Sequence, residues 1–454
     1  MTTTVFIGAG AGFAGDRCDA AGPVVAALAR CDGPRFLMYE MLAERTLALC
    51  QLERRQDPAR GYSPALERML SPVLARCLEA GIKIIGNFGA ANPQAAARRI
   101  ADMARASGLR APRIAVVEGD DLSDRLTDEE LAARETGGHL LAQGRPVISA
   151  NAYLGAQPIA DALNSGADIV VTGRVADSAL ALGPLLHVFK WRADDWDRLA
   201  AGTLAGHLLE CGAQVTGGYF ADPGFKDVPD LAEVGYPIAE IIEDGAMVIT
   251  KPAATGGLVD RLTVTEQMLY EIHDPSAYLA PDVVLDLTDV EVSEIAKDRV
   301  RVTGARGKPA PETLKATVCI EGGFLGETEI SYAGHNAAAR AQLAVDIMRE
   351  RLKSRAPLLA IRVDAIGVTS VLGASDSAPD LRDIDAADVR LRFAAQSFDK
   401  AQIDVLLDEV EGLYCAGPAG GGAVRRRVTP RLASASCLIE RRYAQPRVTL
   451  LGDA

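Results

Sequence analysis

In the first half of the chain, short apolar runs alternate with segments whose apolar residues recur at helical spacing. The runs predict strands at Thr3–Ile7, Arg35–Tyr39, Ile82–Ile85, Ile114–Val117, Pro146–Ser149 and Asp168–Thr172. The segments between them predict helices at Ala20–Arg30, Met41–Leu52, Pro64–Ala80 and Ile159–Ser165, with another opening at Pro93. Such alternation is typical of a parallel sheet with right-handed crossovers. We therefore predict an α/β fold with an N-terminal doubly wound, mostly parallel sheet.

The second half of the chain has a different pattern, in which strand signals cluster together. They lie at Ile238–Ile242, Met247–Thr250, Val283–Leu287 and Val300–Val302, with helical stretches at Glu266–Ile272, Asn336–Leu352 and Lys400–Val410. The segment Gly217–Pro237, rich in turn residues, separates the two halves. We predict an α/β domain over residues 1–220 that carries a strand-end site, and an α+β domain over 221–454 that contributes Gly-rich loops.

Composition and charge exclude several classes of partner. The 454 residues include 48 Lys and Arg against 61 Asp and Glu, which gives a net charge of −13. This balance disfavours binding to nucleic acid and to anionic membranes. No apolar run approaches the roughly 20 residues of a membrane helix, and Met1–Gly15 lacks the Lys or Arg of a signal peptide. The eight Cys are scattered singly, so we expect reduced thiols and a cytoplasmic location. The large acidic surface fits a homo-oligomer.

Polar residues follow the predicted strands at the carboxyl ends, where open α/β sheets bind ligands. Asp16 and Asp120 are candidates for acid–base catalysis, and Arg174 for holding a carboxylate or phosphate. A salt bridge from Arg174 to a neighbouring Asp, or a helix cap at Asp120, is the simpler interpretation. The expected substrate-binding residues are Gly10, Gly12, Arg17, Asn87, Asn92, Asp177 and Ser178.

Two Gly-rich segments suggest phosphate binding. Gly10-x-Gly12-x-x-Gly15 matches a dinucleotide fingerprint, but Phe13 and Asp16 fit it poorly, so a tight turn is the alternative. The segment Gly417–Gly422 precedes three consecutive Arg that are suited to the phosphorylated tail of coenzyme A, or to a solvated strand edge.

His207, Glu210 and Cys211 follow i, i+3, i+4 spacing and share one face of a predicted helix. Such a face can bind zinc or carry out acid–base chemistry, with Glu210 orienting the imidazole, although a packed histidine is the more common case. The cofactor stays unknown. A divalent metal is one option, and its candidate ligands are Asp120, Asp121, His207 and Glu210.

Several strings together, in order along nearly the whole chain, resemble the acyclic terpene utilisation protein A (AtuA) family. They are Ile7-Gly-Ala-Gly-Ala-Gly-Phe-Ala-Gly-Asp16, Gly86-Asn-Phe-Gly-Ala-Ala-Asn92-Pro93, Val117-Glu-Gly-Asp-Asp121, Thr172-Gly-Arg174-Val-Ala-Asp177, Gly206-His-Leu-Leu-Glu-Cys-Gly-Ala-Gln214 and Leu413-Tyr-Cys-Ala-Gly-Pro-Ala-Gly-Gly-Gly422. The resemblance implies a catabolic role in pathways that run through branched acyl-CoA intermediates. Members of the family often carry a small C-terminal ferredoxin-like domain or have a partner protein of that kind. This chain resembles the family core without that domain, so the resemblance implies a small ferredoxin-like partner protein.

The residues and the resemblance together predict a catabolic lyase or hydro-lyase. Its substrate is a branched or hydroxylated small carboxylate or the corresponding CoA thioester, with CoA as part of the substrate. The alternatives are a nicotinamide-dependent oxidoreductase and a non-catalytic subunit of a two-component enzyme.

Overall fold

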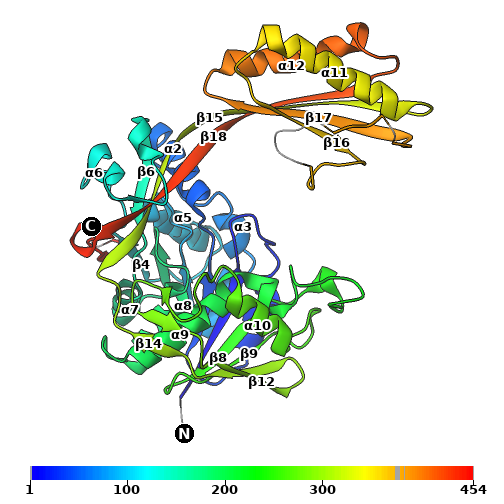
Figure 1. Cartoon of the computed structure of the whole chain (residues 1–454). Helices are drawn as coiled ribbons and strands as arrows, with labels where there is room; N and C mark the ends of the chain where they lie inside the picture. The colour runs from blue at the N-terminus through cyan, green and yellow to red at the C-terminus, as the bar shows by residue number, and fades with distance from the viewer. Residues whose placement is uncertain (1–2, 374–378, 383, 453–454) are drawn as a thin grey trace. The chain divides into compact units, whose positions relative to one another are not determined.

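The fold was examined in a computed structural model that describes residues 3–373, 379–382 and 384–452 (Figure 1). The chain divides into two compact units. Unit 1 comprises residues 1–319 and 434–454, and unit 2 comprises residues 320–433. No helix within the described ranges is both long and apolar enough to cross a membrane.

Unit 1 is built on a ten-stranded mixed sheet. In spatial order its strands are β12 (Glu291–Ala296), β13 (Arg299–Thr303), β9 (Met247–Thr250), β8 (Ile238–Ile242), β1 (Thr4–Ala11), β2 (Arg35–Tyr39), β3 (Lys83–Gly86), β7 (Ile169–Thr172), β4 (Ile114–Glu118) and β19 (Arg447–Leu450). The five strands from β1 to β4 are parallel, and the strands on both sides of them are antiparallel. The predicted α/β class is confirmed, but the sheet is mixed rather than mostly parallel.

The strand pairing of this sheet also places the boundary between the two parts of the chain elsewhere than the sequence pattern suggested. Strand β8 pairs antiparallel with β1, from Thr4 opposite Ile242 to Gly8 opposite Ile238. Residues beyond 220 therefore complete the sheet that the first residues begin, so the boundary between 1–220 and 221–454 is replaced by the division given above. The strand predicted at Pro146–Ser149 forms as β6 (Val147–Ala152), but it pairs with β15 (Thr313–Ala333) rather than joining the parallel strands.

Helices cover the sheet of unit 1. They are α1 (Ala21–Leu28), α2 (Glu44–Gln56), α3 (Leu66–Leu70), α4 (Leu74–Ala80), α5 (Pro93–Ala106), α6 (Asp128–Ala132), α7 (Gln157–Asn164), α8 (Ala179–Phe189), α9 (Trp196–Glu210) and α10 (Arg261–Leu269). Buried residues of α1, α3, α4 and α5 form one core with those of β2, β3 and β7. Helices α7, α8 and α9 pack against one another and against strands of the same sheet. A small sheet of β10 (Tyr278–Leu279), β11 (Val284–Asp286) and β14 (Arg306–Lys308) packs against α9.

Unit 2 contains a four-stranded sheet and two helices. Along the chain the order is β15, α11 (Ala337–Arg355), β16 (Ile361–Ile366), β17 (Asp388–Ser397), α12 (Lys400–Ala416) and β18 (Gly422–Glu440). The spatial order β16-β17-β15-β18 gives the βαββαβ topology of ferredoxin-like folds. A ferredoxin-like unit therefore lies inside the chain, where the sequence pattern predicted only α+β structure.

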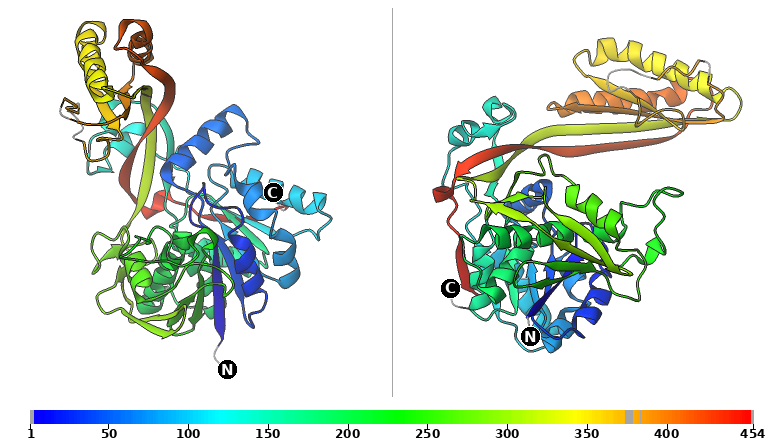
Figure 2. Two further views of the ribbon diagram at one scale, coloured as in Figure 1. Left: turned by 90° about the vertical axis from the view of Figure 1, so that its right-hand side faces the viewer. Right: turned by 60° about the horizontal axis from the view of Figure 1, so that its bottom comes forward.

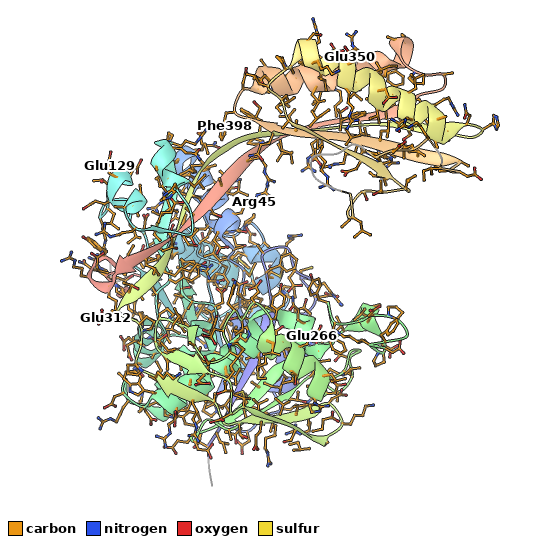
Figure 3. The ribbon with its side chains drawn as sticks, in the orientation of Figure 1. Arg45, Glu129, Glu266, Glu312, Glu350 and Phe398 are labelled. Atoms are coloured by element: carbon orange, nitrogen blue, oxygen red, sulfur yellow. The ribbon has the colours of Figure 1, made fainter. Side chains whose placement is uncertain are left out.

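The two helices of unit 2 lie side by side on one face of its sheet (Figures 1 and 2). The core between them and the sheet includes Ile330, Met348, Phe393 and Leu406. Glu350 stands on α11 on the side away from the sheet (Figure 3). The sheet thus has one face covered by helices, while charged side chains from alternate strand positions occupy the other.

Candidate functional site

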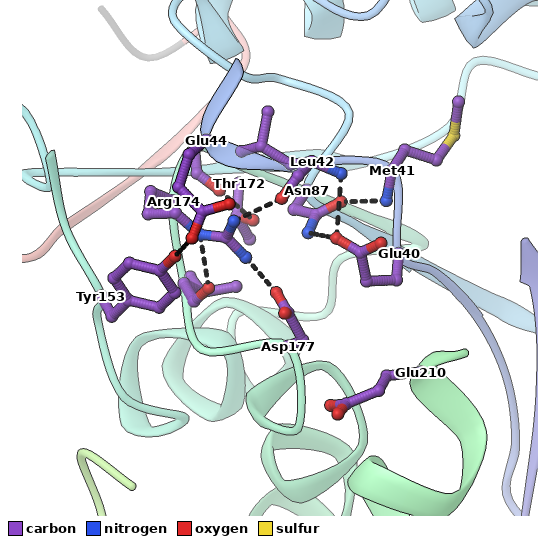
Figure 4. Close-up of polar contacts among 12 residues, drawn as sticks. Glu40, Met41, Leu42, Glu44, Asn87, Tyr153, Thr172, Arg174, Asp177 and Glu210 are labelled. Atoms are coloured by element: carbon purple, nitrogen blue, oxygen red, sulfur yellow. Dashed lines mark hydrogen bonds and ion pairs between the residues drawn. The ribbon is translucent and has the colours of Figure 1, made fainter. Parts of the chain in front are cut away.

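Polar side chains gather where three neighbouring parallel strands end. Glu40 follows β2, Asn87 follows β3 and Arg174 lies two residues beyond β7. Because these strands are adjacent and parallel, their carboxyl ends share one edge of the sheet. We call the group around this edge the strand-end cluster: Glu40, Glu44, Asn87, Tyr153, Arg174, Asp177 and Glu210 (Figure 4).

Arg174 lies at the centre of the strand-end cluster and is 1% exposed. Its Nε donates to the Val175 carbonyl at 2.9 Å, Nη1 donates to the Leu42 carbonyl, and Nη2 donates to the Asp177 carboxylate. The guanidinium carbon also lies 4.5 Å from the centre of the Tyr153 ring. Three nitrogens of the guanidinium are therefore engaged by the protein itself, and the group that Arg174 holds in this structure is Asp177.

Glu40 and Asn87 form a buried hydrogen-bonded pair beside Arg174. The Asn87 amide and the Leu42 backbone N–H both donate to Glu40 Oε1 at 2.9 Å. Asn87 Oδ1 in turn accepts from the Met41 backbone N–H at 2.7 Å. Burial raises the pKa of Glu40, against the effect of the Arg174 charge. Asn87 thus orients a carboxyl group whose neutral form the site favours.

Asp177 is the member of the cluster that combines access with a perturbed acidity. Its side chain keeps 36% of its surface accessible, although the Arg174 that it contacts is buried. Burial raises the pKa of Asp177 well above its usual value, and the nearby carboxylates of Glu40 and Glu210 act in the same direction, while Arg174 opposes them. The pKa of Asp177 is thus shifted in the direction that a general acid requires.

Lys315 lies beside two members of the strand-end cluster, Glu44 and Tyr153. The sequence patterns did not indicate any of these three residues. The Tyr153 hydroxyl donates to Glu44 Oε1 at 2.7 Å, and Lys315 Nζ lies 3.6 Å from the same oxygen. Lys315 Nζ is also 4.7 Å from the centre of the Tyr153 ring. Burial alone would raise the pKa of Glu44, but the Tyr153 hydrogen bond and the Lys315 charge lower it overall. The environments of Glu44 and Asp177 therefore shift the pKa values of these two carboxyl groups in opposite directions.

His207 and Glu210 come together on α9, as their spacing predicted. His207 Nδ1 lies 2.8 Å from Glu210 Oε1. Within the part of the chain that the structure describes, neither His207 Nε2 nor Glu210 Oε2 has a hydrogen-bond partner, and both atoms are buried. Burial alone would lower the pKa of His207, but Glu210 raises it overall. Burial raises the pKa of Cys211 to about 12, so this thiol stays protonated.

Asp120 supports the turn after β7. Its Oδ2 accepts from the Arg174 backbone N–H at 2.9 Å and from the Asn151 amide at 2.8 Å. Burial raises the pKa of Asp120 to about 6. Asp121 points elsewhere: it accepts from Ser123 and keeps 43% of its side chain accessible. In the described ranges no three His, Cys, Asp or Glu side chains are grouped as metal ligands would be, so the four metal candidates do not come together.

The Gly-rich segment after Ile7 does not have the geometry of a dinucleotide fingerprint. Strand β1 runs on through Ala11, and α1 begins ten residues later, at Ala21. A Cβ at Gly10 would lie 2.7 Å from the Tyr39 ring, and one at Gly12 would lie 2.5 Å from the Cys211 carbonyl carbon. These glycines allow close contact between parts of the protein, whereas the fingerprint needs them in a strand–turn–helix junction that faces a phosphate.

Four other predicted residues form contacts within the chain. Asp16 accepts from the Gly12 backbone N–H at 2.7 Å and from the Tyr236 hydroxyl, and so closes its own loop. Arg17 pairs with Asp19 at 2.9 Å and donates to the Ala232 carbonyl. These bonds explain the two residues without a substrate.

Asn92 and Ser178 lie at the starts of two helices. Asn92 caps α5 through the Ala95 N–H, while its amide donates to the carbonyls of Pro58 and Arg60. Ser178 precedes α8 and lies against α9, because a Cβ at Gly206 would be 2.4 Å from the Ser178 carbonyl oxygen. Asn92 therefore has a structural explanation, and Ser178 marks the contact between α8 and α9.

Comparison with known proteins gave one family. The model of the family described as "Acyclic terpene utilisation family protein AtuA" matches residues 5–450. No curated protein and no solved structure matches the chain.

Proposed function

The chain belongs to the AtuA family of acyclic terpene utilisation proteins, and from this premise we propose that it is a catabolic lyase or hydro-lyase. The proposed substrate is a branched or hydroxylated small carboxylate, or its CoA thioester. Elimination of water from such a molecule requires a group that protonates the leaving oxygen and a group that accepts a proton. The strand-end cluster supplies carboxyl groups whose pKa values are shifted in opposite directions.

The observation that carries this proposal is the environment of Asp177. It is accessible, it is held by a buried arginine, and its pKa is raised by burial and by neighbouring carboxylates. Two titratable groups whose environments separate their acidities are a recurrent feature of acid–base sites, and Asp177 and Glu44 form such a pair. In the proposed reaction Asp177 protonates the departing hydroxyl or alkoxide.

Arg174 acts in this proposal through Asp177. Because its guanidinium already binds Asp177 and two backbone carbonyls, it is a positioning residue rather than the group that binds the substrate anion directly. Lys315, whose side chain is 49% exposed, supplies the positive charge that attracts a carboxylate or the phosphates of a thioester.

The test is turnover of a panel of short branched 3-hydroxy acids and their CoA thioesters by the wild type and by Asp177→Asn. This variant keeps the size of the side chain and removes its proton-donating group. We expect the wild type to eliminate water from at least one panel member, and kcat/KM to fall by about 100-fold or more in the variant.

The matched control is Asp102→Asn, since Asp102 is half exposed and pairs only locally with Arg105. It should turn over the substrate at the wild-type rate. A wild-type protein that transforms no member of the panel overturns the proposed function. An Asp177→Asn protein within tenfold of the wild type overturns the role of Asp177.

A further inference from the structure

Within the described residues, two buried polar atoms of the His207–Glu210 pair lack a hydrogen-bond partner. Glu210 uses Oε1 to accept from His207, which leaves Oε2 free, and His207 uses Nδ1, which leaves Nε2 free. The two side chains are only 12% and 3% exposed. Leaving buried polar atoms without hydrogen bonds is unfavourable by about 1–3 kcal/mol each, so such atoms in a native protein require an explanation.

Helix α9 is packed so that Glu210 faces the strand-end cluster. A Cβ at Gly206 would meet the backbone of Ser178, next to Asp177, which brings α9 and the start of α8 into close contact. The negative charge of Glu210 in turn raises the pKa of both Asp177 and Glu40. Figure 4 shows Glu210 reaching from its helix toward the Asp177 side of the cluster, with no hydrogen bond to the residues drawn there.

We propose that Glu210, through its unpartnered Oε2, is the base that removes the substrate's α-proton, and that His207 positions it. This inference rests on the proposed function and adds the second proton-transferring group to it. It also reverses the roles that the spacing on α9 suggested, because the imidazole is more enclosed than the carboxylate and lies behind it.

The elimination step balances with these two groups. The Cα–H bond breaks, its proton moves to Glu210 Oε2, and its electron pair forms the Cα=Cβ double bond. The Cβ–O bond breaks, and the leaving oxygen takes the proton of Asp177 and departs as water. Glu210 gains the proton that Asp177 loses, and exchange with solvent restores both groups before the next turnover.

The neighbours of Glu210 are shifted toward their neutral forms. Burial raises the pKa of Tyr278 well above its usual value and that of Cys211 to about 12, so both stay neutral. Asp177 and Glu40 are shifted toward their protonated forms. His207 donates its Nδ1–H to Oε1, which keeps the carboxylate in place and leaves Oε2 for the substrate.

The first experiment separates proton abstraction from elimination. Exchange of the substrate's α-proton in D2O is followed by NMR, beside turnover, for the wild type, Glu210→Gln and Asp177→Asn. We expect Glu210→Gln to lose both exchange and turnover by at least 100-fold. Asp177→Asn should lose turnover but keep exchange within tenfold of the wild type. Glu350→Gln on α11, a fully surface-placed glutamate, is the matched control and should keep both.

The second experiment tests His207 as a positioning residue. In His207→Asn the amide nitrogen takes the place of Nδ1 and still donates to Glu210, whereas His207→Leu removes the donor. We expect the Asn variant to keep exchange within tenfold. The Leu variant should lose most of it, because the Glu210 carboxylate then lacks the donor that holds it in place.

The outcomes separate this inference from the proposed function. Wild-type protein that neither exchanges nor transforms any panel member overturns both. Wild-type activity that survives in Glu210→Gln overturns the inference and leaves the proposed function standing. A His207→Leu protein that keeps exchange within tenfold of the wild type overturns the positioning role of His207.

Discussion

The two units each carry a charged cluster on a sheet, and the clusters differ in how their charges are balanced. On the face of the unit 2 sheet without helices, four arginines face three carboxylates: Arg362, Arg390, Arg392 and Arg425 with Glu327, Glu329 and Asp364. Each of these carboxylates has an arginine nitrogen within 4 Å. In the strand-end cluster of unit 1, Arg174 binds Asp177 and its charge acts on Glu40, Lys315 lies near Glu44, and Glu210 pairs with His207.

This difference shows which cluster serves stability and which serves chemistry. Paired, partly exposed charges on a sheet surface contribute modestly and need no further explanation. Carboxylates gathered this closely are unfavourable for folding, and the raised pKa values of Glu40 and Asp177 show how the protein accommodates them. Strongly perturbed groups gathered at one strand edge are characteristic of functional sites.

The largest expected difference between the clusters follows removal of one arginine from each. Arg174→Met leaves Asp177 and its neighbouring carboxylates without their buried counter-charge, so we expect unfolding free energy to fall by about 3–5 kcal/mol. Arg390→Met should lower it by about 1 kcal/mol or less, because Arg390 is 37% exposed and Glu329 keeps Arg425 nearby. Urea unfolding followed by tryptophan fluorescence measures the first effect, since Trp191 and Trp196 both lie in unit 1.

For Arg390, hydrogen exchange of β17 peptides measures the local effect in unit 2. Equal losses of stability at the two positions would remove the distinction between the clusters. A stable Arg174→Met protein would mean that the surrounding carboxylates are all protonated in the native state.

A smaller effect is expected from the titration of Asp120, which makes the unfolding free energy depend on pH. Its folded-state pKa of about 6 lies above the ordinary aspartate pKa of about 3.9, so the folded protein binds this proton more tightly than the unfolded chain does. Stability from this group is therefore present at low pH and is lost as pH rises, by about 2 kcal/mol between pH 4 and pH 7. Asp120→Asn carries no charge and keeps an acceptor for Arg174 N and Asn151, so its stability should lack this fall.

Urea midpoints of the two proteins across this pH range give the comparison, with Asp102→Asn as an exposed control that should follow the wild type. In unit 2, Glu409 should contribute a pH dependence of stability with the opposite sign. Two arginines lower the pKa of Glu409, mainly through its bond to Arg351, so its contribution is present at neutral pH and is lost on acidification. A wild-type stability that rises from pH 4 to pH 7 as much as that of Asp120→Asn would contradict the account of Asp120.

Local patterns predicted the strands well but not their partners. The apolar runs at Arg35–Tyr39, Ile238–Ile242 and Met247–Thr250 form strands with those bounds. Pairing of β8 with β1 joins residues more than 200 positions apart, and neither run carries a sign of that choice. The ferredoxin-like topology of unit 2 was missed for the same reason, because it depends on the spatial order of four strands.

The residues of the candidate site likewise fall into those that local patterns indicated and those that depend on contacts between distant segments. Arg174 and Asp177 were found because they follow a strand, and His207 and Glu210 because they share a helix face. The patterns did not indicate Tyr153, although it follows a predicted strand. Its contacts Glu44 and Lys315 lie on elements that are distant in the sequence. Asn92 was assigned to the substrate, but the pair Asn92-Pro93 is a readable helix start, and capping explains it.

The smallest expected effects come from two helical glycines, one in each unit. Gly206 in α9 has the Ser178 backbone within 2.8 Å of where a Cβ would lie, whereas Gly412 in α12 has nothing within 4 Å. Gly206→Ala should therefore destabilise unit 1 by about 1–3 kcal/mol through overpacking. It should also lower turnover, because displacing α9 moves Glu210 away from Asp177.

Gly412→Ala should do the reverse, since alanine is favoured over glycine in an unobstructed helix by about 0.5–1 kcal/mol. Hydrogen exchange of α12 peptides should slow, while tryptophan-monitored unfolding and turnover should match those of the wild type, because neither the fluorophores nor the strand-end cluster lie in unit 2. If Gly412→Ala lowered turnover as much as Gly206→Ala, the chemistry could not be assigned to the strand-end cluster of unit 1 alone. If Gly206→Ala left turnover intact, close packing of α9 on α8 would not be what places Glu210.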